Sequence, residues 1–103
     1  MSKISDDLSY WSRKAYGEET PFKLASVLLY EACDISKEQT RLDDYPDEAL
    51  IREVNIRTAV GDVLAMTQLY CSVKGLDFYT EYMNGCSRAI ERCKEKRQGK
   101  GGF

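Results

Sequence analysis

The stretch from Glu48 to Lys74 constrains the fold most, because it contains no proline and meets its first strong stop at Gly75. From Thr58 onward it carries one carboxylate, Asp62, among apolar residues. An ionised carboxylate is costly to bury unless a cation or hydrogen-bond donors meet it. The stretch therefore predicts a long buried helix in which Asp62 faces a partner.

Gly61 lies in the middle of this predicted helix. A glycine in a helix interior costs roughly 1 kcal/mol relative to alanine, so a packing or functional reason should offset it. We expect the close approach of the preceding helix to be that reason.

An amphipathic helix is predicted from Ile4 to about Tyr16. Its apolar residues are spaced three and four apart, as on one face of a helix, at Ile4, Leu8, Trp11 and Ala15. Gly17 is placed to end this helix.

A second helix is predicted to begin at Pro21, with Thr20 as its N-cap. Residues 22–33 are apolar on most sides, which predicts a place inside a bundle or an oligomer interface. The helix turns polar and fades near Leu42.

Residues 43–47 form the clearest turn of the sequence, and Asp47 is expected to cap the helix of residues 48–74. Asp77 is expected to cap a fourth helix that runs to about Arg97. That helix carries an apolar seam at Tyr82, Cys86, Ala89, Ile90 and Cys93.

These elements predict an all-α fold of four helices joined by short turns, with no strand. With 103 residues, 43% of them hydrophobic, the chain has the length of one domain with a modest core. We assign residues 1–97 to this domain and residues 98–103 to a flexible C-terminal tail.

Charge and composition narrow the possible partners and chemistry. The net charge of −2 gives no electrostatic reason to expect nucleic acid or an anionic membrane. The four cysteines contain no C-x-x-C pair and the chain has no His, so structural zinc, a disulfide scaffold and His-dependent nucleophiles are poor interpretations. We expect all four cysteines to be small core residues. With no signal-peptide or membrane-spanning run, we expect a soluble, cytoplasmic protein.

Carboxylates on two predicted helices are expected to face one another. Glu31, Asp34 and Glu38 lie along one face of the second helix, and Asp62 would face them across an antiparallel hairpin. Such a cluster is typical of an oxygen-rich site for Mg²⁺ or Mn²⁺. For Glu38, which is flanked by polar residues, a solvated helix face is the favoured interpretation.

Three segments together resemble the MazG-like, all-α nucleoside triphosphate pyrophosphatases. Residues 28–34, Leu-Leu-Tyr-Glu-Ala-Cys-Asp, resemble the E-x-x-E helix of this family. The Gly-Asp-Val-Leu of residues 61–64, with Lys-Gly-Leu-Asp at residues 74–77, resembles its second signature. Residues 11–17 are similar to its Trp-containing first helix, so the likeness spans about residues 8–97.

The resemblance implies a four-helix bundle with a central antiparallel hairpin, completed by assembly into a homodimer or a dimer of dimers. It implies hydrolysis of an NTP or dNTP to the monophosphate and pyrophosphate, with Mg²⁺ or Mn²⁺ held by Glu31, Asp34 and Asp62, and Glu38 as a substitute ligand. The implied phosphate contacts are Lys74, Asn84, Arg88, Lys94 and Arg97. Trp11 and Tyr30 are the implied contacts to the base.

The sequence departs from the family pattern at two positions. The family has a Glu three residues before Asp62, where this chain has Ala59, and often a Glu directly before the first ligand, where it has Tyr30. Three consequences stay open: a single metal ion, recruitment of Glu38, or loss of catalysis. The alternative functions are therefore a non-catalytic interaction or regulatory module, or an assembly scaffold in which a cation neutralises Asp62.

Overall fold

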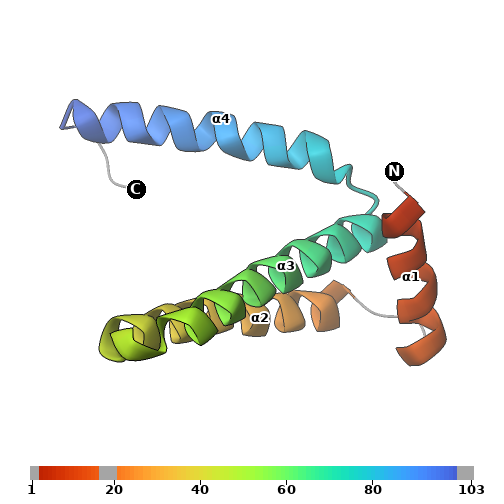
Figure 1. Ribbon diagram of the computed structural model, residues 1–103. Helices are drawn as coiled ribbons and strands as arrows, with labels where there is room; N and C mark the ends of the chain where they lie inside the picture. Colours follow the sequence, from red (N-terminus) through yellow and green to blue (C-terminus); the bar gives the residue numbers. More distant parts are fainter. Residues whose placement is uncertain (1–2, 17–20, 100–103) are drawn as a thin grey trace.

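The structure is a computed structural model that describes residues 3–16 and 21–99 (Figure 1). The elements are α1 (Lys3–Tyr16), α2 (Pro21–Asp44), a single 3₁₀ turn (Pro46–Glu48), α3 (Ala49–Lys74) and α4 (Phe78–Arg97). No strand occurs in these ranges, so the predicted all-α class is confirmed. The positions expected to end α1 and to cap α2, Gly17 and Thr20, lie outside the described residues.

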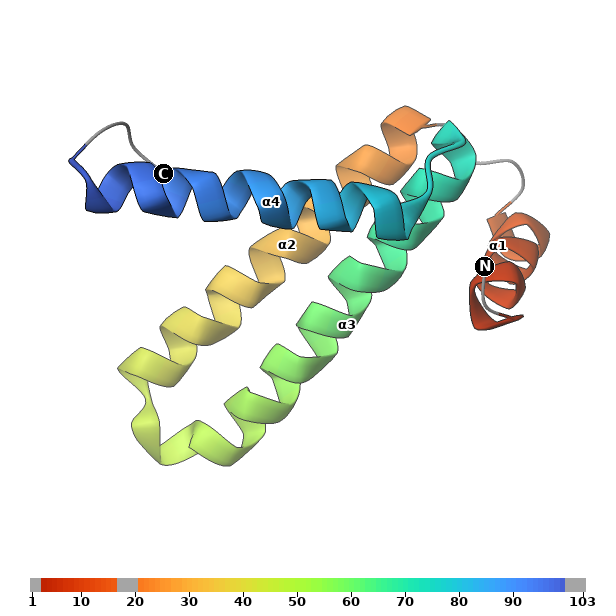
Figure 2. The same cartoon turned by 90° about the horizontal axis from the view of Figure 1, so that it is seen from above.

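The centre of the fold is an antiparallel hairpin of α2 and α3, which lie side by side along their length (Figure 2). Helix α1 lies beside the C-terminal end of α3, where the hydroxyl groups of Ser9 and Ser72 are 3.5 Å apart. The hairpin therefore supplies most of the tertiary structure of a single chain.

The junction between α3 and α4 has the predicted stop and start signals. Gly75 adopts the left-handed conformation with φ of 71°, and the N–H of Leu76 bonds to the carbonyl of Cys71 at 2.8 Å. The Asp77 carboxylate then accepts bonds from the backbone N–H of Thr80 at 2.9 Å and from its hydroxyl at 2.8 Å. Both bonds lower the pKa of Asp77, and the bond from the backbone N–H has the larger effect. Asp77 is confirmed as the N-cap of α4.

The expectation that Asp47 caps α3 is wrong. Pro46 opens a 3₁₀ turn, and Asp47 lies inside this turn. Glu48 takes the N-cap position of α3 without a side-chain capping bond. The physical reason is the fixed φ of proline, which starts helical backbone before Asp47 is reached.

The expectation of a buried third helix is also wrong for the single chain. Only Ala59, Leu69 and Cys71 of α3 are buried, and in α2 the fully buried apolar side chain is Leu24. Helix α2 covers α3 along most of its length and α1 covers only its C-terminal end, while Val60 and Leu64 are exposed.

Helix α4 leaves the hairpin at its first residues and diverges from it, so that α3 and α4 form an open V (Figure 1). None of its residues is buried, and the apolar seam predicted for α4 is exposed or half-buried. The radius of gyration is 16.7 Å, compared with about 13 Å for a compact chain of this length. The single chain is therefore an extended arrangement of helices.

The predicted role of Gly61 is not found in this chain. Gly61 is exposed, and a Cβ at this position would meet no atom within 4 Å. It lies on the side of α3 that α2 does not cover, so α2 gives no reason for a glycine here.

Two of the four cysteines depart from the prediction that all are small core residues. Cys71 is buried and Cys86 half-buried, but Cys33 and Cys93 are exposed. Each exposed thiol lies on a helix face that no other described helix covers. None of the helices in the described ranges is both long enough and apolar enough to span a membrane.

Candidate functional site

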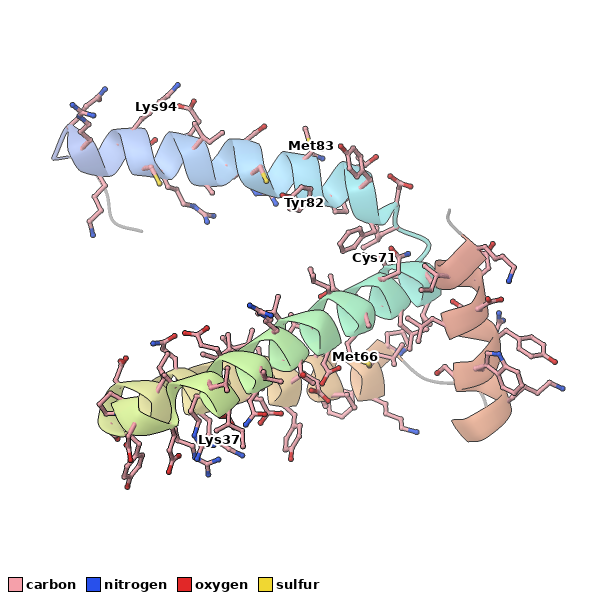
Figure 3. The ribbon with its side chains drawn as sticks, in the orientation of Figure 1. Lys37, Met66, Cys71, Tyr82, Met83 and Lys94 are labelled. Carbon is pink, nitrogen blue, oxygen red and sulfur yellow. The ribbon has the colours of Figure 1, made fainter. Side chains whose placement is uncertain are left out.

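A hollow of about 240 Å³ lies between α2 and α3 and contains three of the predicted site carboxylates, Asp34, Glu38 and Asp62. The residues that line it are Tyr30, Asp34, Lys37, Glu38, Asn55, Thr58, Ala59 and Asp62. Figure 3 shows Lys37 on the side of the hairpin that faces away from α4. The candidate site is therefore built by the hairpin alone.

Helical spacing explains how these side chains meet. On α2, Asp34, Lys37 and Glu38 are three and four residues apart and share one face. On α3, Asn55 and Asp62 are seven residues apart and also share a face. The antiparallel hairpin turns these two faces toward the same hollow.

Glu38 is a buried member of an ion-pair network, which corrects its interpretation as part of a solvated face. The residue is only 8% exposed. Its Oε2 accepts from Nη1 of Arg52 at 3.3 Å and from Nδ2 of Asn55 at 3.4 Å. Its Oε1 accepts from Nη1 of Arg41 at 3.5 Å. The physical reason is the hairpin register, which places the cation and the amide of α3 opposite this carboxylate.

Arg52 joins Glu38 to the turn end of α3. Its Nη2 lies 2.6 Å from Oε1 of Glu48, and its Nε lies 3.0 Å from the same oxygen. The bonds to Glu48 are the largest cause that raises the pKa of Arg52. Glu38 is therefore ion-paired with one cation from each helix of the hairpin, Arg41 of α2 and Arg52 of α3.

The pKa of Glu38 reflects this environment. Burial raises it, but the bond from Asn55, the bond and charge of Arg52 and the charge of Arg41 together lower it by more, so the pKa lies below its ordinary value of 4.5. The ionised form is therefore favoured in the folded chain.

We predict a pH-dependent loss of stability in Glu38→Gln. A lowered folded pKa stabilises the fold above the unfolded pKa, and this contribution is lost as pH falls through the folded value. The variant should therefore unfold at a lower urea concentration than the wild type near pH 7. This difference in urea midpoint should become smaller by about pH 3. Glu53→Gln, an exposed position on the same hairpin, is the control and should show no such narrowing.

Asp34 and Asp62 are the two carboxylates of the hollow that remain available. Asp34 is half-buried and Asp62 is exposed. Neither makes an ion pair within the described part of the chain. The scaffold alternative requires a Lys or Arg that neutralises Asp62. The described part of the chain contains no such ion pair.

The carboxylates of the hollow are suited to a hard cation, such as Mg²⁺, that takes its other oxygen ligands from water or substrate phosphates. Among the described residues, no group of three or more His, Cys, Asp or Glu side chains is placed to hold a metal ion. Glu31 is half-buried and does not line the hollow. Mg²⁺, however, is often bound by one or two carboxylates together with substrate phosphates. Asp34 and Asp62 are two such carboxylates, and the described residues do not place a third beside them to form an all-protein metal cage.

The predicted phosphate contacts are not brought to this hollow in the described structure. Lys74, Asn84, Arg88, Lys94 and Arg97 are exposed and none lines it. Lys94 lies 3.6 Å from Glu91 and points away from the hairpin (Figure 3). For the four residues of α4 the physical reason is the divergence of α4 from α3. Lys74 is the last residue of α3, twelve residues beyond Asp62.

The two predicted base contacts are separated. Tyr30 lines the hollow and is 69% exposed. Trp11 lies on α1, is 66% exposed, and packs edge-to-face on Tyr10 with ring centroids 5.2 Å apart. The single chain therefore offers one aromatic face to a ligand in the hollow.

Sequence reasoning missed three polar residues of the hollow, Lys37, Asn55 and Thr58. A signal was present, because Lys37 follows Asp34 by three residues and Thr58 precedes Asp62 by four. They add an ammonium, an amide and a hydroxyl beside the carboxylates, so the hollow presents groups that suit both a cation and phosphate oxygens.

The fold and the hollow define an all-α protein with a carboxylate-bearing helical hairpin. No protein-family model, curated protein or solved structure matches this chain.

Proposed function

We propose that this chain is a metal-dependent nucleotide pyrophosphohydrolase that converts an NTP or dNTP to the monophosphate and pyrophosphate. The observation that carries the proposal is the meeting of Asp34 and Asp62, from two different helices, in one hollow with Lys37. The resemblance to the MazG-like pyrophosphatases supports the same reaction. The chain has no His, and hydrolysis by a metal-activated water does not require one.

Under this proposal each group of the hollow has a defined task. Asp34 and Asp62 would hold Mg²⁺ or Mn²⁺, with Glu31 one helical turn before Asp34 as the further ligand that the resemblance implies. When bound, the metal screens the triphosphate charge and lowers the pKa of a water molecule. Lys37 would contact phosphate oxygens, and Tyr30 would offer its ring to the base at the rim.

The size of the hollow favours the phosphates over the whole nucleotide. Its volume of about 240 Å³ is below the roughly 300–1,000 Å³ of pockets that enclose a small molecule. The triphosphate would enter it and the base would remain outside. We further propose that the four helices complete a bundle as a homodimer or a dimer of dimers, which covers the base.

A second function is favoured by two observations. Ala59, which stands where the family has a metal-ligating Glu, is 6% exposed and lines the hollow. Glu38, the nearest substitute, is neutralised by Arg52 and Arg41. A catalytically degenerate helical module that retains the hollow for interaction or regulation is therefore the alternative.

The experiment that separates the two functions is pyrophosphate release from a panel of NTPs and dNTPs with Mg²⁺ or Mn²⁺. The enzyme should release pyrophosphate from at least one nucleotide, and chelation should stop it. No release from any nucleotide, with helical content intact, would reject the enzyme. A nucleotide that raises the melting temperature without release would support the regulatory module.

We predict that Ala59→Glu increases the response of the protein to Mg²⁺. The added carboxylate would lie beside Asp34 and Asp62, so like charges should lower the melting temperature without metal. Mg²⁺ should then raise that temperature by more than in the wild type, and pyrophosphate release should be kept or increased. Ala59→Gln is the uncharged control, and an equal Mg²⁺ response in both variants would contradict the prediction.

A further inference from the structure

An apolar groove lies at the turn end of α3, on a part of the hairpin that the proposed nucleotide site does not use. Its volume is about 430 Å³, and it is lined by Asp47, Glu48, Leu50, Ile51 and Val54. The apolar side chains are unusually open to solvent, since Leu50 is 84% exposed and Ile51 is 59% exposed. The groove thus has an apolar floor and an acidic rim.

The exposed face of α3 continues this groove along the helix. Val54 follows Leu50 by four residues and Gly61 follows Val54 by seven, so the three share one face. A Cβ at Gly61 would meet open space. This strip of α3 therefore admits the close approach of another helix, which α2 does not provide.

Helix α4 has the complementary properties. Its seam is exposed at Tyr82, which is 55% exposed, and at Ile90, which is 54% exposed. Figure 3 shows Tyr82 on the side of α4 nearer the hairpin and Lys94 on the opposite side. Its last turn is basic, and Lys96 and Arg97, three and four residues after Cys93, lie beside the seam. An apolar helix face with a basic end matches an apolar groove with an acidic rim.

The chain exposes more surface than a compact monomer of its mass. The chain exposes 7929 Å², whereas a compact monomer of its mass would expose about 5,900 Å². The excess of about 2,000 Å² exceeds the roughly 800 Å² that each partner buries in a standard interface.

From these observations we infer that α4 of a second copy lies along the groove of α3, with its basic end beside Asp47, since Glu48 is already paired with Arg52. In a two-fold dimer the contact is reciprocal, so each chain supplies one α4 and one groove. The inference rests on the homo-oligomer included in the proposed function and names the surfaces that form it. It is tested by association alone, so it stands or fails separately from pyrophosphate release.

The first test compares two exposed apolar residues by size-exclusion chromatography with light scattering over a range of concentrations. Leu50→Glu places a charge on the floor of the groove and should weaken dimerisation at least about tenfold. The matched control is Ile4→Glu on α1, where the side chain is 78% exposed and outside the groove. It should dimerise as the wild type does, with helical content unchanged in both variants.

The second test reverses the charges on the two surfaces. Asp47→Lys should weaken the dimer, and so should Lys96→Glu with Arg97→Glu on α4. Mixing the two variants should restore association, because each pair of opposed charges is re-formed in a mixed dimer, and added salt should reduce both effects.

A wild type that is monomeric throughout the concentration range would overturn the inference. If the wild type is a monomer that Leu50→Glu destabilises, α4 folds onto its own hairpin, and the inferred dimer is also rejected. Equal dimerisation of Leu50→Glu and Ile4→Glu, or a mixture of charge variants that stays dissociated, would reject the groove as the binding surface.

Discussion

Asp62→Asn should reduce pyrophosphate release at least ~100-fold, because a metal supplies several kcal/mol of transition-state stabilisation and each 1.36 kcal/mol is tenfold in rate. The amide keeps the shape of the side chain and removes its charge. Asp62 is exposed and makes no ion pair within the described residues, so the substitution should leave the fold intact. The measurement is initial rate at saturating Mg²⁺, with circular dichroism to check helical content.

Glu53→Gln is the matched control for this experiment. It removes the same charge from the same helix, at an exposed position that does not line the hollow. Its rate should stay near that of the wild type. If both variants lose activity equally, net charge and not the site is responsible, and if neither loses activity, Asp62 does not act in the reaction.

Leu24→Ala should destabilise the folded chain by about 2–5 kcal/mol, which is the usual effect of removing a large buried aliphatic side chain. Leu24 is the fully buried large side chain of the described core, at 0% exposed. Single domains are stable by only about 5–15 kcal/mol, so this one change should remove a large fraction of the total. Urea unfolding followed by circular dichroism would measure it.

Leu29→Ala on the same helix gives the comparison, because Leu29 is 69% exposed. Its effect should stay within about 0.5 kcal/mol at concentrations below those at which the chain associates. Similar losses in both variants would show that α2 is covered on a second face, and that the core is larger than the single chain forms.

The ends of the helices could be predicted well from sequence wherever the signal is local. Pro21 begins α2, Gly75 ends α3 and Asp77 caps α4, each through backbone geometry or a bond to a residue three positions away. Asp47 is the exception, because Pro46 starts a 3₁₀ turn that displaces the cap by one residue.

The candidate site could be predicted only in part. Asp34 and Asp62 do share a hollow, as their spacing on two antiparallel helices suggests. The state of Glu38 could not be predicted, because its partners Arg52 and Asn55 lie 14 and 17 residues away in sequence. A polar neighbourhood in sequence says nothing about which cation a hairpin places opposite a carboxylate.

The sequence alone determined the four helices, their order and most of their ends, because these depend on bonds within a few residues of the chain. Only the tertiary structure decided that Glu38 is neutralised by Arg52, that Gly61 faces open space, and that α4 diverges from the hairpin. Those outcomes depend on which helix faces meet and in what register, and helical periodicity specifies a face without specifying its partner.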